Sequence, residues 1–237
     1  MYLSRLVLNP RSPAVRRDLA DCHAMHRTVM SGFLSFQIDG DARAALGVLH
    51  RVETDPRSGR VTLLVQSRVE PDWSRLEGGY LTDDHGADIN PACKRIDLQY
   101  QAIGAGKVLA FRLRANPTRK IDTKSGPDGS RRNGRRVELS RETDQIAWLR
   151  RKGEQGGFRL LSVRVDSAVA NVRVVPGVKA VGSRGCGGAQ RLVFGTTLFE
   201  GVLQVEDAER FRRTLECGVG PGKAYGFGLL SVASLEG

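Results

Sequence analysis

The alternation of apolar and polar residues predicts a β-strand at the amino terminus. Residues 1–8, MYLSRLVL, alternate and are rich in strand-forming types, and Asn9-Pro10 ends the run. Ser12 and Pro13 then suit an N-cap and a first helical position. Apolar residues follow at spacings of three and four, at Val15, Leu19, Cys22, Met25, Val29 and Phe33. This spacing predicts one helix with a single buried stripe.

Two alternating runs after this helix predict an antiparallel hairpin. They are ALGVLHRVE (45–53) and RVTLLVQSR (60–68), and the turn-rich segment TDPRSG joins them. After a loop, the runs IDLQYQA (96–102) and KVLAFRLRA (107–115) flank the tight turn IGAG, so we expect a strand on each side. The order strand, helix, two strands, loop, strand is nearly one ferredoxin-like unit.

The second half of the chain repeats this order. A basic, glycine-containing loop leads to a predicted helix, SRETDQIAWLRRKG, with Ser140 and Thr143 as candidate caps. Strands are predicted in FRLLSVRVDS, NVRVVPG and RLVFGTTLFEGVLQV, a helix in EDAERFRRTLECG, and a last strand in GFGLLSVAS. We therefore predict an α+β fold of two tandem ferredoxin-like domains with antiparallel sheets, residues 1–105 and 106–237.

Composition narrows the class of protein. The chain has 237 residues, 40% of them apolar, which is enough for one large core or two small ones and argues against disorder. It contains no run of about 18 uncharged apolar residues and no signal-peptide pattern. We expect a cytoplasmic protein without a membrane span. The four cysteines lie far apart, which predicts reduced thiols rather than disulfides or a zinc ribbon.

Positive charge is concentrated in one stretch of the chain. The net charge is +11, and residues 112–136 hold nine basic residues against two acidic ones, which is +7 of that total. Such a concentration favours a polyanionic partner, with a solvated basic loop as the alternative. A membrane surface suits it less, because no amphipathic helix carries these charges. Arg131 and Arg132, in this stretch, are candidate RNA contacts.

The first predicted helix carries a cluster with three possible roles. His23 and His26 lie three positions apart, and Arg27 follows at once, so the three side chains leave neighbouring points of the helix. A metal site would need further ligands, for which His50 and His85 are the remaining histidines. A packing role at the border of the apolar stripe is the second possibility. The third is proton transfer beside an anion, because neighbouring cations lower the pKa of an imidazole and leave it neutral at pH 7.

A glycine-rich loop near the carboxyl terminus is a second candidate site. Residues 218–228, GVGPGKAYGFG, contain five glycines but match neither nucleotide-binding fingerprint, since Cys217 and Ala224 replace the first glycine and the hydroxyl of Walker A. A loop with few side chains lets a phosphodiester approach main-chain N–H groups. A helix C-cap and turn would account only for its first glycine. The candidate contacts are Gly220, Gly222 and Lys223.

A second basic segment joins two predicted strands. Residues 171–191, NVRVVPGVKAVGSRGCGGAQR, are rich in glycine and are called the finger below. Its composition predicts a flexible basic loop that lies along a nucleic-acid groove, or one that orders only when a partner binds. The candidate contacts are Arg173, Lys179 and Arg184.

The type of nucleic acid follows from the aromatic content and from the histidines. Aromatic residues make up only 6% of the chain, and no predicted strand carries the aromatic pair that stacks unpaired bases. Abundant arginine therefore suits a structured stem that is bound through its backbone and shape. A neutral histidine beside RNA can also deprotonate a 2′-hydroxyl, which then attacks the adjacent phosphate. DNA lacks this group and remains an alternative on charge alone.

Several longer blocks carry a family resemblance. They are MYLSRLVLNPRSPAVRRDLADCHAMHRT, FRLRANPT, QIAWL followed by GGFRLL, LFEGVLQVED, and GVGPGKAYGFGLLSVA. In this order they resemble the CasE family, the CRISPR RNA endoribonuclease of the type I-E Cascade complex. The resemblance implies metal-independent cleavage of CRISPR repeat RNA at the 3′ base of a stem-loop, which leaves a 2′,3′-cyclic phosphate and a 5′-hydroxyl. It also implies that the protein needs no cofactor and retains the cut RNA among the other Cascade subunits; we expect a monomer when it is free.

The resemblance also assigns residues. The family's catalytic histidine matches His26, and its companion tyrosine matches position 23, where this chain has His23. An imidazole can replace the phenol as donor or proton carrier, and which histidine is acid or base stays open. Arg27 is expected to stabilise the charge of the phosphorane. The finger falls where the family inserts a basic hairpin into the RNA groove. The changed residue 23 leaves a second possibility, a non-catalytic RNA-binding subunit of the same complex.

Overall fold

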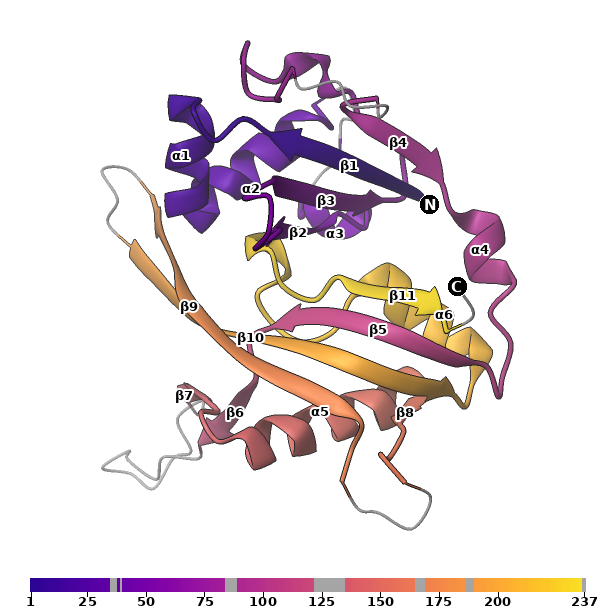
Figure 1. Cartoon of the computed structure of the whole chain (residues 1–237). Coiled ribbons are helices and arrows are strands. Elements are labelled where there is room, and N and C mark those ends of the chain that lie inside the picture. The colour runs from indigo at the N-terminus through magenta and orange to yellow at the C-terminus, as the bar shows by residue number, and fades with distance from the viewer. Residues whose placement is uncertain are drawn as a thin grey trace.

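The described residues form a four-stranded and a five-stranded antiparallel sheet, one from each half of the chain, and a smaller two-stranded sheet (Figure 1). The computed structural model describes residues 1–34, 38, 40–83, 89–121, 135–164, 169–185 and 190–235. Within these residues, every helix is too short or too polar to span a bilayer. The predicted α+β class with two tandem ferredoxin-like units is confirmed.

The amino-terminal sheet has the strand order β2-β3-β1-β4. Its strands are β1 (Tyr2–Leu8), β2 (Leu49–Thr54), β3 (Val61–Ser67) and β4 (Ala92–Arg95). The predicted hairpin is present, since β2 pairs with β3 from Leu49↔Gln66 to Thr54↔Val61. The short helices α3 (Ala42–Ala45) and η1 (Trp73–Arg75) lie in the connections.

The strand predicted over residues 96–102 is wrong. β4 lies just before it, and helix α4 (Asp97–Gln101) takes its place. Ile96 and Ile103 are buried and Tyr100 packs against the carboxyl-terminal core, whereas Leu98 is 76% exposed. The buried residues recur at spacings of four and three, which is the period of a helix rather than of a strand.

The single helix predicted near the amino terminus is two helices. They are α1 (Pro13–Ala20) and α2 (Cys22–Ser31). Asp21 between them is extended, with φ −131° and ψ 108°, and its side chain accepts from the N–H groups of His23 and Ala24, so a new helix begins there. The turn at Asp21 leaves Leu19 41% exposed, and the predicted stripe is therefore interrupted.

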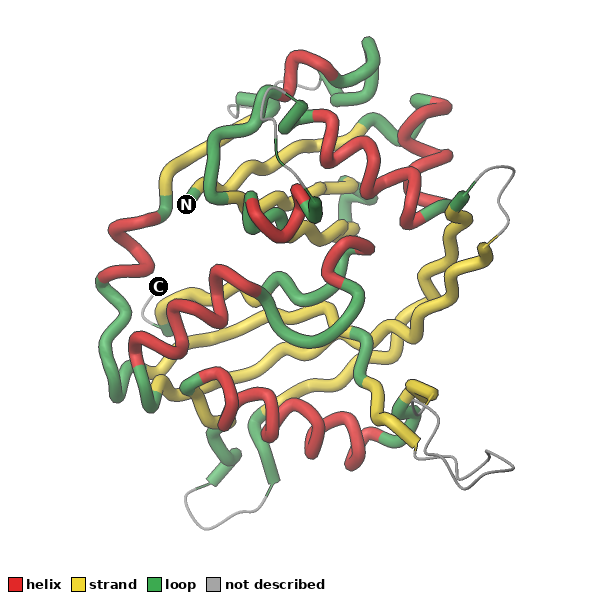
Figure 2. Tube along the Cα trace, turned by 180° about the vertical axis from the view of Figure 1, so that it is seen from behind, coloured by secondary structure: helices red, strands yellow, loops and turns green. Residues whose placement is uncertain are grey.

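The carboxyl-terminal sheet has the order β11-β5-β10-β8, and β9 pairs with β10 beside it. Its strands are β5 (Val108–Ala115), β8 (Phe158–Leu160), β9 (Val172–Arg184), β10 (Gln190–Val205) and β11 (Leu230–Ser234). A separate pair is formed by β6 (Thr118–Ile121) and β7 (Arg135–Glu138). Helices α5 (Glu142–Gly156) and α6 (Ala208–Cys217) cover the same face of the sheet (Figure 2).

Helix boundaries in this half were predicted in part. Helix α6 ends before Gly218, as expected from the sequence. Helix α5 begins after Arg141 without a side-chain cap, so Ser140 and Thr143 do not cap it. Its first turn carries Glu142 and Asp144, whose negative charges favour a helix start in place of a cap.

Each sheet has its own hydrophobic cluster. The amino-terminal cluster includes Leu6, Leu8, Val15, Met25, Val29, Phe33, Leu63, Val65, Trp73 and Tyr80. The carboxyl-terminal cluster includes Phe111, Leu113, Trp148, Leu149, Phe158, Phe199, Leu203, Phe211 and Leu215. The division of the chain at residue 105 stays a proposal; it lies between the end of β4 and the start of β5.

Arg51 of β2 holds the two halves together. Its side chain is almost fully buried and donates to the carbonyls of Arg112 and Leu229 at 3.2 and 2.9 Å, and to Oγ of Ser231 at 2.9 Å. Glu53 lies 2.6 Å away and balances its charge. A buried charge is retained only where its hydrogen bonds are satisfied, so these contacts fix how the sheets meet.

Replacing Arg51 with alanine is expected to lower the free energy of unfolding by about 3 kcal/mol, because buried carbonyls and Glu53 lose their donor. Urea unfolding followed by circular dichroism measures the change. In the control variant Arg213→Ala, which removes an exposed ion pair with Glu209, stability should stay nearly unchanged. Equal losses in both variants would contradict the role given to Arg51.

Candidate active site

Three rings from distant parts of the sequence meet between the two halves. His23 and His26 lie on α2, and Tyr225 lies on the short helix η3 (Lys223–Tyr225). The ring centroids of His23 and His26 are 6.2 Å apart, and that of Tyr225 lies 6.3 and 6.1 Å from them. Tyr225 was absent from the sequence candidates. Its position as an aromatic ring inside a glycine-rich loop was the signal for it.

The glycine-rich loop has a conformation that only glycine adopts easily. All five of its glycines have φ between 75° and 87°. A Cβ at Gly220 would lie 2.8 Å from Trp148, and one at Gly222 would lie 2.9 Å from Phe227. These two glycines are therefore needed for the packing of the protein itself, and their contact with RNA stays a prediction.

An aromatic stack joins the loop to β10, the strand that pairs with the finger. Tyr225 stacks on Phe194 of β10 with a centroid distance of 4.9 Å and an interplanar angle of 28°. Phe194 also contacts Phe227, at 5.8 Å, and the Arg114 guanidinium lies 4.7 Å from the centre of the Phe227 ring. The low aromatic content of the chain thus hides a local concentration of rings at the site.

The finger forms strand β9, so the strand predicted in NVRVVPG is present, and the prediction of a flexible glycine-rich loop is wrong for the described residues that follow it. β9 and β10 pair from Gly201↔Val172 to Gln190↔Arg184, with a shift in register between Phe194 and Thr196. Valines predominate in the run NVRVVPGVKAV, and their preference for strands outweighs the glycines. The far end of this pair lies beside α1 and α2 in Figure 1.

Asp21 joins the finger to the helix that carries the histidines. One carboxylate oxygen accepts from the N–H groups of His23 and Ala24, at 2.8 and 3.0 Å. The other accepts from the N–H of Ser183 in β9, at 3.1 Å. A Cβ at Gly182 would lie 2.8 Å from this carboxylate, so glycine permits the close approach. The finger therefore lies directly against the start of α2.

The predicted cations are distributed unevenly around the rings. Arg173 pairs with Glu200 and Lys179 with Glu138, and both side chains are largely exposed on β9. Arg184, at the end of β9, is one of the cations that lower the pKa of His26. Lys223 is half-buried next to Tyr225, and burial lowers its pKa. Arg131 and Arg132 lie outside the described residues.

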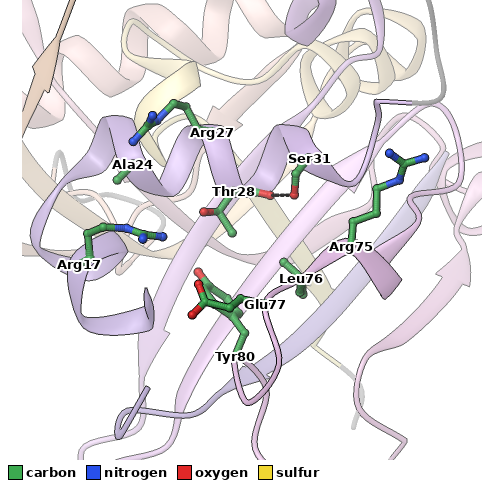
Figure 3. A pocket seen from close by; sticks show the side chains of 9 residues that line it. All are labelled: Arg17, Ala24, Arg27, Thr28, Ser31, Arg75, Leu76, Glu77 and Tyr80. Carbon is green, nitrogen blue, oxygen red and sulfur yellow. Dashed lines mark hydrogen bonds between the residues drawn. The ribbon is translucent and has the colours of Figure 1, made fainter. Parts of the chain in front are cut away.

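Arg27 lies in a different depression from the three rings. Its exposed side chain borders a hollow of about 320 Å³ (Figure 3). The other residues around it include Arg17, Thr28, Ser31, Arg75, Glu77 and Tyr80. The structure thus brings His23 and His26 together with Tyr225, and it places Arg27 on another part of the α2 surface.

The electrostatic surroundings keep His26 neutral. Burial lowers its pKa most, followed by the nearby His23 and Arg43, with a smaller effect from Arg184. The direction agrees with the sequence prediction, although burial contributes more than the cations. Burial also lowers the pKa of His50, to about 3, so this fully buried imidazole is neutral as well. The Nδ1 atoms of His23 and His26 are buried without a partner among the described residues, which leaves Nε2 as the nitrogen that can reach a ligand.

The metal interpretation gains no support from the described residues, in which no three His, Cys, Asp or Glu side chains form a group that could hold an ion. His85 and Cys186 lie outside these residues, and Cys22, Cys93 and Cys217 are free thiols. The expectation that the site works without a metal stays a prediction.

A comparison with protein families gives one match over nearly the whole chain. The family model described as CRISPR associated protein matches residues 1–234. The chain belongs to this family. It is 38% identical over 241 residues to the CRISPR-associated endoribonuclease Cse3 of Thermus thermophilus, a match that covers 98% of this chain and 100% of the relative.

A second relative and one solved structure are also informative. The CRISPR system Cascade subunit CasE of Escherichia coli (strain K12) is 35% identical over 149 residues, which cover 60% of this chain and 64% of the relative. The structure of Thermus thermophilus Cse3 bound to an RNA representing a pre-cleavage complex matches with a TM-score of 0.75 and 36% identity, over 98% of each chain. The resemblance to the CasE family is therefore confirmed.

Variants of Asp21 should separate its two roles. Asp21→Ser keeps an N-cap for α2 but is too short to reach Ser183, so the Ser183 amide should exchange about fivefold faster, as expected for the loss of about 1 kcal/mol. Asp21→Ala should also lower the free energy of unfolding by about 1 kcal/mol. Hydrogen exchange and urea unfolding measure the two effects.

The matched control for these variants is Asp207→Ser, which changes the N-cap of α6. It should leave exchange at Ser183 unchanged. Wild-type exchange at Ser183 in Asp21→Ser would mean that the bond to the finger does not hold in solution.

Proposed function

We propose that this chain is a metal-independent endoribonuclease that cleaves CRISPR repeat precursor RNA at the 3′ base of a stem-loop. The 2′-hydroxyl attacks the adjacent phosphate and gives a 2′,3′-cyclic phosphate and a 5′-hydroxyl. The observation that carries the proposal is the meeting of two imidazoles on α2, one of them kept neutral, beside the glycine-rich loop. The names of the relatives, an endoribonuclease and a Cascade subunit, support the substrate and the class of reaction.

The two histidines suit opposite roles in proton transfer. His26, with its lowered pKa, suits the general base: its Nε2 takes the proton of the 2′-hydroxyl as the bond from O2′ to phosphorus forms. The bond from phosphorus to O5′ then breaks, and His23 in its protonated form gives O5′ a proton. The atoms balance without an added water or metal, and in this proposal His26 is the base and His23 the acid.

Positive charge around the rings suits the phosphate of the transition state. Arg43, on α3, lies close enough to lower the pKa values of His26 and Lys223, so a phosphate beside His26 would lie near both cations. The proposed role of Arg27 requires its long side chain to leave the separate depression of Figure 3. Along the stem, the proposed RNA contacts are Arg131, Arg132, Arg173, Lys179, Arg184, Gly220, Gly222 and Lys223.

The proposed partners follow from the substrate. The chain would hold the mature RNA after cleavage and join the other Cascade subunits in the cytoplasm, where the transcript is made. The finger, a stiff strand pair with basic side chains along β9, suits a groove of the RNA stem. Its bond to Asp21 would carry the stem to a defined position beside His23.

His26→Ala is expected to slow single-turnover cleavage of the host's repeat RNA by about 10² to 10⁴, while the dissociation constant for the stem-loop stays nearly unchanged. His23→Ala should also slow cleavage, because it removes the proposed acid, and His23→Tyr should retain activity if a phenol can take over the donation to O5′. A 2′-deoxy substitution at the scissile nucleotide should abolish cleavage, and EDTA should have no effect.

Three results would count against the proposal. Equal losses of binding and cleavage in His26→Ala would mean that this residue supports the fold. Cleavage of the 2′-deoxy substrate would exclude attack by O2′. Binding without cleavage by the wild-type protein would point to the non-catalytic subunit, and equal affinity for duplex DNA at matched salt would point to a DNA-binding protein.

The cleavage rate should depend on pH through His26. Because the pKa of His26 is lowered, the base becomes protonated only below its ordinary pKa of about 6.5, so the part of the profile in which the rate rises with pH should lie below 6.5. Arg43→Gln removes a nearby cation and should move this rise to higher pH. Arg213→Gln removes an exposed cation on α6 and should not move it. Single-turnover rates between pH 4.5 and 8 test this, and an unmoved profile in Arg43→Gln would refute the electrostatic link.

A further inference from the structure

We propose that Tyr225 is a further catalytic residue, whose hydroxyl donates a hydrogen bond to a non-bridging oxygen of the scissile phosphate. The inference rests on the proposed function. It begins from the triangle of rings, in which Tyr225 lies about equally far from both imidazoles. No hydrogen bond joins the three rings among the described residues. A phosphate placed between them could therefore form hydrogen bonds with all three.

The position of Tyr225 is set before any RNA arrives. Helix η3 lies between Gly222 and Gly226, which are both left-handed, with φ of 80° and 82°. The Tyr225 N–H donates to the Gly222 carbonyl at 2.8 Å, and Phe194 covers one face of the ring. Donors held in place in this way stabilise developing charge without a cost of reorganisation at the moment of reaction.

The loop around Tyr225 packs closely against both sheets. A Cβ at Gly226 would lie 3.0 Å from Arg114 Nη1 and 3.4 Å from His50 Nε2. Arg114 Nη1 also donates to the Gly226 carbonyl at 3.3 Å. His50 therefore supports the loop from β2 of the amino-terminal sheet, and Arg114 supports it from β5 of the other sheet.

The hydroxyl has no structural role in the described part of the chain. The Tyr225 side chain is only partly buried, its hydroxyl has no hydrogen-bond partner among the described residues, and it borders a groove of about 780 Å³ between the halves. Phenylalanine would stack on Phe194 equally well. The hydroxyl is thus free to bind a ligand.

A neutral donor also suits the chemistry better than another cation. A further positive charge beside the histidines would repel the imidazolium that proton transfer from the 2′-hydroxyl creates on His26. A phenol supplies a hydrogen bond to the oxyanion without this effect. The neutral tyrosine and the cations Arg43 and Lys223 would then stabilise the phosphate together.

Tyr225→Phe is the direct test, measured as single-turnover cleavage of repeat RNA and as stem-loop affinity. Removal of one oxyanion donor costs about 10²-fold in rate, so we expect a loss of this order with an affinity within about twofold of wild type. Tyr2→Phe, which removes a hydroxyl at the start of β1, should leave both unchanged. Tyr225→Ala should lose at least as much rate, since it also removes the stack on Phe194.

A sulfur substitution tests the contact itself. Replacing the non-bridging oxygen that Tyr225 contacts with sulfur, a weak acceptor, should slow the wild-type protein but have little further effect on Tyr225→Phe. The two phosphorothioate diastereomers carry sulfur in place of different non-bridging oxygens and are tested separately. Only one of them should slow the wild-type protein clearly more than it slows Tyr225→Phe.

The outcomes separate this inference from the proposed function. If wild-type protein cleaves in a 2′-hydroxyl-dependent way and Tyr225→Phe cleaves equally fast, the hydroxyl is not catalytic and the inference alone fails. The same holds if only Tyr225→Ala is slow, since the ring would then act by packing. If wild-type protein does not cleave, or cleaves 2′-deoxy RNA, the proposed function fails, and the inference with it.

Discussion

The geometry of the site depends on one carboxylate, that of Asp21. Because its two oxygens bond in different directions, it begins α2 and holds the finger at the same time. The start of a helix sets the rotation of every residue after it, so this cap determines where the rings of His23 and His26 point. The finger and the histidines therefore keep a fixed relation to each other.

The site is completed only where the two halves of the chain meet. Helix α2 comes from the first half, and the glycine-rich loop and the finger come from the second. Arg51 and Gln66 reach across with buried hydrogen bonds, to Leu229 and Leu215 among others. Any change that let the sheets slide would separate Tyr225 from the histidines, so the contact between the halves is part of the active-site architecture.

Two imidazoles of this strongly basic chain, those of His26 and His50, stay neutral. Burial is the largest cause for His26 and His50, and cations such as Arg43 act in the same direction. The charge that attracts a nucleic acid therefore also keeps a base ready to accept a proton. Histidines exposed on the same surface would be less shifted, since water would screen these cations.

The sequence by itself determined the local elements: the β2–β3 hairpin, β5, β10, and the end of α6 at Gly218 follow from periodicity and turn residues. It also placed the two histidines side by side on one helix. The N-cap at Asp21 and the helical spacing of Ile96, Tyr100 and Ile103 were local signals that the sequence analysis missed. Only the tertiary structure decided the pairing of the finger and the separation of Arg27 from Tyr225. The physical reason is range: hydrophobic period and capping act over a few residues, whereas the approach of residue 225 to residue 26 depends on how two sheets pack.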